Sequence, residues 1–250
     1  QHSSLSSYIL DLLRFTSALI VFLYHFHFTL PGYQAVMIFF VLSGYFISHS
    51  VIKSMKQGVW SWSDYLIRRI IRLWIVLLPA LSLTYVWAKI QTHLFGSATI
   101  FKGVLDFKTL IGNILFFQDI KVKQFGLNGP LWSLTYEFWY YILFPCALFV
   151  IFSKKKPVKM FYALLFVCIS LFVGKQIMLY FLIWLLGTLV AIIQPRKFKS
   201  SANNYFVLVF LVLLVTASTK GLYTLYSEPM SWVHPFFFPD LSVGFAFSLL

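Results

Sequence analysis

The chain has 250 residues, a formal net charge of +13 and a hydrophobic content of 60%. Only 11% of its residues are charged, whereas a soluble globular domain carries about 25%, so an ordinary soluble domain is excluded. The excess of apolar residues excludes intrinsic disorder. These residues form long uninterrupted runs rather than the short alternating segments of a spanning β-barrel. The composition therefore predicts an all-α fold, a polytopic transmembrane helical bundle.

Seven apolar runs follow one another along the chain, and an eighth begins near residue 236. As helices, the first and the fourth each reach about 34 Å, enough to cross a hydrocarbon core of about 30 Å. No repeat or low-complexity stretch divides the runs, so we expect one transmembrane domain over 1–250 with about seven to eight spans. The eighth run is still apolar at Leu250, and we expect C-terminal spans to be missing from this sequence. The first seven runs cover about 8–30, 34–52, 66–88, 130–152, 158–173, 176–193 and 203–218.

Lysine and arginine gather between the apolar runs in three clusters, Lys53 to Arg72, Lys154 to Lys159 and Arg196 to Lys199. This pattern follows the positive-inside rule of proteins in a lipid bilayer and accounts for most of the charge, so no nucleic-acid partner is expected. All three clusters are cytoplasmic only if the N-terminus is cytoplasmic and 108–118 does not cross. Because that segment is too short to span, it is expected to be a re-entrant or surface helix. We therefore predict a multi-pass protein of the cell (inner or plasma) membrane, with 89–129 outside.

Asp11, Arg14 and His25 place ionisable groups within the first run, where each is a candidate site because such groups are costly in a membrane. Arg14 and His25 are separated by three helical turns plus about 20°, so they share a face about 16 Å apart along the axis. Arg14 lies near the inner end, and His25 about 8 Å below the outer end. Two interpretations stay open: a functional pair, or an Asp11–Arg14 surface ion pair with a packed histidine.

Glu137 is the only acidic residue well inside the fourth run. It lies about 10 Å below the outer end, at a depth similar to that of His25. Ser133, Tyr140 and Tyr141 stand at i−4, i+3 and i+4 and give Glu137 a polar face. It is either a functional carboxylate or a buried neutral carboxyl held by one hydrogen bond.

Arg69 and Arg72 lie one helical turn apart where the third run begins, with Arg68 adjacent. Arginine forks suit phosphate groups, but arginines at this position also anchor helix ends at anionic headgroups.

Several other classes of site are not indicated. The six histidines show no metal-ligand spacing, so no metal is expected, and neither a P-loop nor a dinucleotide motif is present. Ser43 and Gly44 form a small pair that permits a close backbone approach or a kink. Cys146 and Cys168 lie within apolar runs and are expected to be free thiols.

Four sequence elements resemble the motifs of acyltransferase family 3, a family of integral membrane O-acyltransferases. They occur in the family's order within residues 10–145, and after residue 150 only the hydropathy supports the likeness. The elements are Leu10-Asp11-Leu12-Leu13-Arg14 with His25 (R-x10-H), Phe39 to Gly44 (Phe-Phe-x-Leu-Ser-Gly), Arg69-Ile70-Ile71-Arg72 (R-x-x-R) and Asn128 to Glu137 (Asn-x-Pro-Leu-Trp-Ser-Leu-x-x-Glu). This family usually has about ten spans, and its late histidine-containing element is absent here.

The resemblance implies transfer of an acyl group, often acetyl, from a cytoplasmic acyl-CoA such as acetyl-CoA to a hydroxyl of a glycan or polysaccharide outside. In that scheme Arg69, Arg72 and Arg14 would pair with the phosphates of CoA on the inner side. His25 would act as the general base on the acceptor hydroxyl or as a transient acyl carrier. Glu137 would orient His25 or help to activate the acceptor.

Two other classes of function stay open. A proton-coupled transporter or carrier also uses intramembrane histidine, glutamate and arginine, and broken helices line transport sites. No inverted repeat and no second set of intramembrane acids is visible in the sequence. A structural membrane subunit is the third alternative.

Overall fold

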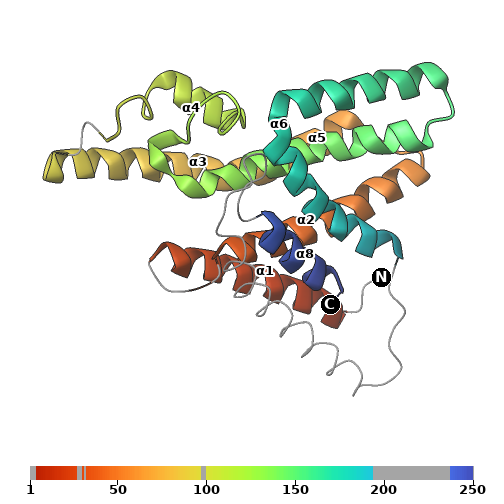
Figure 1. The fold of residues 1–250 in the computed structure, drawn as a ribbon, viewed down its shortest axis with the longest axis horizontal. Coiled ribbons are helices and arrows are strands. Elements are labelled where there is room, and N and C mark those ends of the chain that lie inside the picture. The colour runs from red at the N-terminus through yellow and green to blue at the C-terminus, as the bar shows by residue number, and fades with distance from the viewer. Residues whose placement is uncertain (1–3, 27–29, 31, 97–99, 194–236, 250) are drawn as a thin grey trace. The chain divides into compact units, whose positions relative to one another are not determined.

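The computed structural model describes residues 4–26, 30, 32–96, 100–193 and 237–249, and these residues form helices and loops without a β-strand (Figure 1). The chain divides into two compact units. Unit 1 contains 1–56 and 176–250, and unit 2 contains 57–175. The all-helical prediction is confirmed for the described residues.

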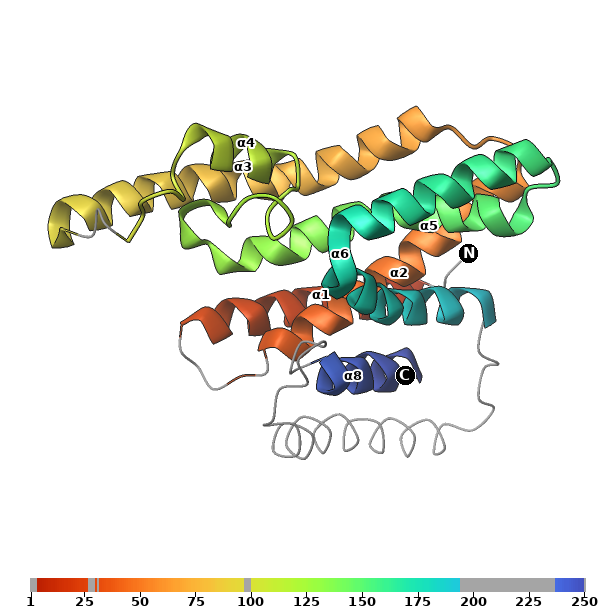
Figure 2. The same ribbon diagram turned by 45° about the horizontal axis from the view of Figure 1, so that its top comes forward.

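Unit 1 is built from α1 (Ser4–His25), α2 (Gly32–Lys56), the last part of α6 and α8 (Phe237–Leu249). Both α1 and α8 pack against α2, as Figure 2 shows. The Ser48 and Thr188 hydroxyls lie 2.6 Å apart and join α2 to α6 by a buried hydrogen bond.

Glycine lets α2 and α6 approach closely at this contact. A Cβ atom on Gly44 would lie 2.0 Å from the Trp184 carbonyl oxygen, and one on Gly187 would lie 1.9 Å from that of Val41. Of the two expectations for Ser43–Gly44, the close approach is therefore confirmed, and α2 runs through this point as one helix.

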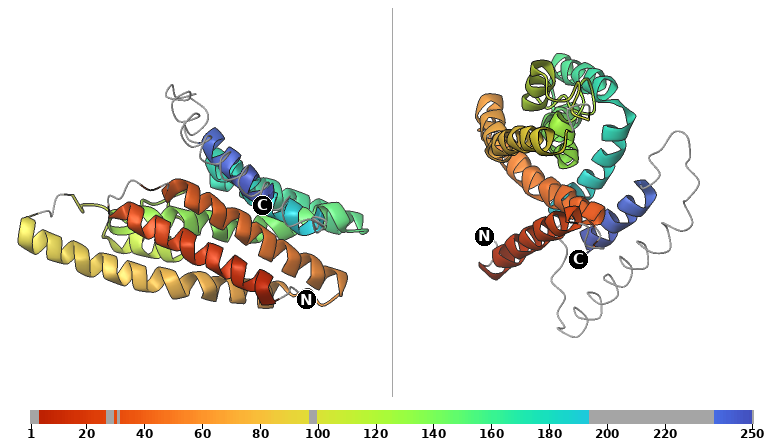
Figure 3. Two further views of the ribbon diagram at one scale, coloured as in Figure 1. Left: turned by 90° about the horizontal axis from the view of Figure 1, so that it is seen from below. Right: turned by 90° about the vertical axis from the view of Figure 1, so that its left-hand side faces the viewer.

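Unit 2 consists of α3 (Trp62–Phe95), α5 (Trp132–Phe152) and the first part of α6, with short elements between α3 and α5. Figure 3 shows α3 as one long helix with α5 alongside it. Helix α6 covers Lys156–Ile193 but is broken at Gly174, where φ is 83° and ψ is 171°. This break matches the expected boundary between the runs 158–173 and 176–193. The short elements are α4 (Phe107–Ile114) and the 3₁₀ turns η2 (Phe125–Leu127) and η3 (Gly129–Leu131).

Helix α4 has only eight residues, which confirms that 108–118 contains no spanning helix. Asp106 caps it by accepting a hydrogen bond of 2.7 Å from the Thr109 N–H. That bond lowers the pKa of Asp106, so the cap stabilises α4 at neutral pH and is lost as the pH falls through the lowered pKa. The Asn113 side chain donates to the Lys123 carbonyl and accepts from the Phe125 N–H, which fixes the loop after α4.

Four described helices are long and apolar enough to cross a membrane: Gly32–Lys56, Trp62–Phe95, Gly129–Phe152 and Lys156–Ile193. The predicted count of seven to eight spans therefore stays a prediction. The predicted run 203–218 lies outside the described residues, and the described part of the eighth run is α8, with 13 residues. Cys146 and Cys168 are free thiols, as expected.

The prediction for the outer end of the first run was wrong. Helix α1 ends at His25, so this residue stands at the end of its helix and not about 8 Å below it. The hydropathy continues toward residue 30, whereas the helical backbone of α1 ends at His25.

Candidate functional site

His25 ends α1 with an exposed imidazole ring. Its Nδ1 lies 2.7 Å from the carbonyl oxygen of Val21. Because a carbonyl oxygen only accepts hydrogen bonds, Nδ1 must carry the proton, and Nε2 of the neutral ring then keeps its lone pair. The Tyr24 ring lies edge-on to His25 at 5.4 Å. The local helix geometry therefore fixes the tautomer that a general base or a nucleophile requires.

Arg14 lies on the same helix and contacts Asp11 and Phe46. Its Nη1 is 3.3 Å from Oδ1 of Asp11, and its guanidinium lies 4.0 Å from the centre of the Phe46 ring on α2. The Asp11–Arg14 surface pair is thus present in the structure. Exposed pairs of this kind contribute about 0–1 kcal/mol. Breaking the contact with Asp11 in order to bind a phosphate would therefore cost the protein little stability.

In unit 2, a chain of contacts joins Arg69 to Glu137. The Arg69 guanidinium lies 5.4 Å from the ring centre of Tyr65 and 5.8 Å from that of Tyr141. The Tyr65 hydroxyl donates a 3.0 Å hydrogen bond to the Tyr141 carbonyl. The Tyr141 hydroxyl donates to Oε1 of Glu137. The expected polar face of Glu137 is therefore present at Tyr141, and through this tyrosine it reaches Arg69.

The basic residues at the start of α3 have different surroundings. Arg68 and Arg72 are exposed, whereas Arg69 is half-buried, and its Nε is buried without a hydrogen-bond partner within the described part of the chain. Arg72 is therefore free to reach a ligand or a headgroup, while Arg69 is tied to the tyrosines beside it.

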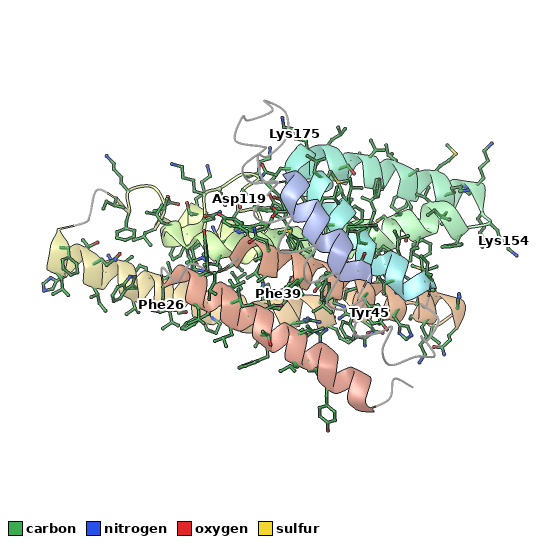
Figure 4. All side chains as sticks on the ribbon, turned by 60° about the horizontal axis from the view of Figure 1, so that its bottom comes forward. Phe26, Phe39, Tyr45, Asp119, Lys154 and Lys175 are labelled. Atoms are coloured by element: carbon green, nitrogen blue, oxygen red, sulfur yellow. The ribbon has the colours of Figure 1, made fainter. Side chains whose placement is uncertain are left out.

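The predicted site residues thus fall into two groups. Arg14 and His25 belong to unit 1, and Arg69, Arg72 and Glu137 belong to unit 2. The expectation that Glu137 orients His25 stays a prediction. Figure 4 labels Phe26, the neighbour of His25, at one end of unit 1. Among the described residues, no group of three or more His, Cys, Asp or Glu side chains could hold a metal ion.

The sequence analysis did not single out Asp240, a fully buried acidic residue on α8. The Tyr180 hydroxyl donates a 2.7 Å hydrogen bond to its Oδ2. One signal was available in the sequence, because an acid at the start of an apolar run is unusual. Its partner lies on another helix, however, and no local spacing connects the two residues.

Replacing Tyr141 with phenylalanine tests the contact with Glu137. For the acyl transfer that the sequence elements imply, losing this hydrogen bond to a carboxyl group is expected to lower the rate by roughly tenfold, since such bonds contribute about 1.5–3 kcal/mol and only part of that acts in the transition state. Transfer rate and thermal unfolding of the purified variant are the measurements. Tyr162→Phe is the control, because the Tyr162 hydroxyl accepts from Trp62 Nε1 at 2.8 Å in the same unit. If both variants lose stability and keep full activity, Tyr141 has only a structural role.

Comparisons with known proteins agree with the sequence elements. The family model described as an acyltransferase domain, acyltransferase family 3, matches residues 7–250. An O-acetyl transferase of Shigella phage Sf6 is 35% identical over 160 residues, a match that covers 59% of this chain and 43% of the relative. The matched part is thus less than half the length of that relative. No solved structure matches. Because the family model covers nearly the whole chain, the chain belongs to acyltransferase family 3.

Proposed function

We propose that this chain is, or is the N-terminal part of, a membrane O-acyltransferase that moves an acetyl group from cytoplasmic acetyl-CoA to a hydroxyl of a cell-surface or exported glycan. Membership of the family and similarity to a protein named as an O-acetyl transferase support the reaction class. The observation that carries the proposal is His25, an exposed imidazole whose Nδ1 is bound to Val21 and whose Nε2 is left as the base.

His25 performs the proton transfers in this scheme. Its Nε2 takes the proton from the glycan hydroxyl as the hydroxyl oxygen attacks the thioester carbonyl carbon. The tetrahedral intermediate then collapses, the carbon–sulfur bond breaks, and the thiolate of CoA takes the proton from Nε2. The Val21 carbonyl stabilises the imidazolium formed in between, because it accepts from Nδ1 throughout. A transient acyl-His25 intermediate uses the same nitrogen and remains the alternative.

In this proposal the arginines bind acyl-CoA, the donor of the acyl group. Arg72 is exposed, so its guanidinium can bind the phosphates of acyl-CoA directly. Arg69 is half-buried beside Tyr65 and Tyr141, and in the proposal it adds positive charge one helical turn from Arg72. Arg14 lies about 16 Å from His25 along α1, and its partner Asp11 is exposed. An extended pantetheine arm has a comparable length, so it could bring a thioester from Arg14 toward His25.

The proposed orientation follows the basic clusters. We place the N-terminus and the segments 53–65 and 153–159 in the cytoplasm of a cell with this protein in its inner or plasma membrane. Trp62, Phe149 and Tyr162 stack with one another, with ring centres 4.4 to 6.4 Å apart. Such an aromatic cluster beside lysines is typical of a membrane interface.

The test of the function uses membranes that contain the chain and acetyl-CoA labelled in the acetyl group. The acceptor is the surface polysaccharide of the host cells, freed of its esters with alkali. We expect the label to enter the polysaccharide as an alkali-labile ester. If wild-type protein leaves the polysaccharide unlabelled while the glycan crosses the membrane, the carrier function is favoured and the transferase is not.

Arg72→Lys separates donor binding from helix anchoring. Lysine keeps the charge required for insertion but loses the planar fork that pairs with phosphate. We expect acyl-CoA affinity to fall by about 1–2 kcal/mol, or about 5- to 30-fold, the scale of a charge-assisted hydrogen bond. Titrating acyl-CoA against detergent-purified proteins measures this change.

The matched control is Arg68→Lys, because Arg68 is also exposed and lies in the same helical turn. Its donor affinity should equal that of wild type. If Arg72→Lys also binds acyl-CoA as tightly as wild type, Arg72 is an interfacial anchor.

A further inference from the structure

Asp240 is a buried carboxyl group with an unfilled hydrogen-bonding position. Its exposed fraction is 0%. Oδ2 accepts a hydrogen bond from the hydroxyl of Tyr180 on α6. Oδ1 is buried without a hydrogen-bond partner among the described residues. Val243, one turn further along α8, is also buried, and the Phe40 ring lies 6.5 Å from that of Tyr180. The Oδ1 atom is therefore shielded from water and accepts no hydrogen bond from any described residue.

Such an arrangement is unfavourable for the protein on its own. A buried acceptor that has given up its bonds to water without replacement costs about 1–3 kcal/mol, and more when it is charged. An apolar residue at position 240 would avoid that cost. An aspartate buried between two apolar helices is therefore expected where a ligand supplies the hydrogen-bond donor that the protein lacks.

The neighbours of Asp240 connect it to the end of unit 1 that holds His25. Asp240 interacts electrostatically with Tyr33 at the start of α2. The Tyr33 ring lies 5.9 Å from the Tyr24 ring, and Tyr24 adjoins His25. Tyr33 is 41% exposed, so this neighbour of Asp240 reaches the surface of unit 1.

Resting on the function proposed above, we infer that Asp240 binds the acyl acceptor. Its Oδ1 receives a hydrogen bond from one hydroxyl group of the glycan, while another hydroxyl of the same glycan gives its proton to His25 and attacks the thioester. Tyr180 orients the carboxyl by holding Oδ2, and this leaves Oδ1 for the ligand. A carbohydrate carries several hydroxyl donors around one ring, so it can fill this position and present a reacting hydroxyl to Nε2 at the same time.

An N–H group of the pantetheine arm of acetyl-CoA is the other group in this reaction that could donate a hydrogen bond to Oδ1 of Asp240. Position favours the glycan, because Asp240 lies near Tyr33 and the end of α1, whereas the arginines proposed for the donor begin at Arg14, three turns away. The two sources predict different changes. Loss of a glycan contact raises the KM for the polysaccharide, and loss of a pantetheine contact lowers the affinity for acetyl-CoA.

The experiment compares wild type, Asp240→Asn and Tyr180→Phe as purified full chains, with ester-free host polysaccharide as acceptor. Asp240→Asn is expected to raise the KM for the polysaccharide by roughly tenfold or more, the scale of one charge-assisted hydrogen bond, with unchanged acetyl-CoA affinity. Its thermal unfolding temperature should stay the same or rise, because asparagine has nearly the shape of aspartate, keeps an oxygen that can accept from Tyr180 and adds no buried charge. A purely structural carboxyl would instead lower that temperature without raising KM. Tyr180→Phe should lower the unfolding temperature, and it should raise the KM for the polysaccharide by a smaller factor than Asp240→Asn does.

Asp64→Asn, which changes an exposed acid in unit 2, is the control and should match wild type in all three measurements. The inference is overturned if Asp240→Asn keeps the wild-type KM for polysaccharide, or if its acetyl-CoA affinity falls by the same factor. A wild-type protein that transfers no acetyl group overturns the proposed function itself. An active wild type with an unaffected Asp240→Asn variant overturns only the role of Asp240.

Discussion

Alanine in place of His25 is expected to abolish transfer, with a loss of about 10²- to 10⁴-fold in rate, the usual contribution of a general base. The reason is the tautomer of the His25 ring. Its Nδ1 donates to the Val21 carbonyl oxygen at 2.7 Å, so Nε2 is the nitrogen that can accept a proton. Because the imidazole is exposed, its removal leaves no cavity in a packed core, and the protein should insert and remain stable. The measurement is label transfer from acetyl-CoA to polysaccharide by purified protein.

His93→Ala is the matched control, since His93 lies in the last turn of α3 in unit 2 and has no proposed role. It should transfer at the wild-type rate. A His25→Ala protein with nearly normal activity would rule out both the base and the acyl-carrier roles. The two roles are separated by incubating wild type with labelled acetyl-CoA alone, because only an acyl carrier becomes labelled on His25.

Local features of the site could be predicted from the sequence. Glu137 and Tyr141 are one helical turn apart, so helical periodicity alone brings them together, and the same holds for Asp11 and Arg14. The short helix α4 was predictable because a segment of that length cannot span the membrane. Hydropathy did not locate the end of α1, because apolar residues continue beyond His25 while the helix does not.

Contacts between helices could not be predicted. The Arg69–Tyr141 contact joins α3 to α5, and the Tyr180–Asp240 bond joins α6 to α8, at separations that no periodicity encodes. In a bundle where nearly every surface is apolar, the pattern gives few clues to which helices pair. Gly44 illustrates the limit, since its sequence indicated a close approach but not that Gly187 is the partner.

The second large effect is expected from Gly187→Val, which should prevent unit 1 from forming its native packing. A Cβ atom at this position would lie 1.9 Å from the Val41 carbonyl oxygen and 2.7 Å from the Tyr45 nitrogen. These are backbone atoms of α2 and cannot rotate away, so the helices must separate and the adjacent Ser48–Thr188 hydrogen bond must lengthen. We expect a loss of about 3 kcal/mol or more, the upper part of the range for overpacking, out of a total of about 5–15 kcal/mol.

The yield of monodisperse protein in detergent and its unfolding temperature measure this loss. Gly44→Val should behave in the same way, because its Cβ would meet the Trp184 carbonyl oxygen from the opposite helix. Gly129→Ala is the control for folding, since a Cβ atom there would meet no atom within 4 Å. Normal yield and stability for both valine variants would mean that α2 and α6 do not approach at these glycines. The Phe39–Gly44 element would then need a different explanation, because in this structure its glycine serves to bring the α2 backbone against α6, the helix that carries Tyr180 to Asp240.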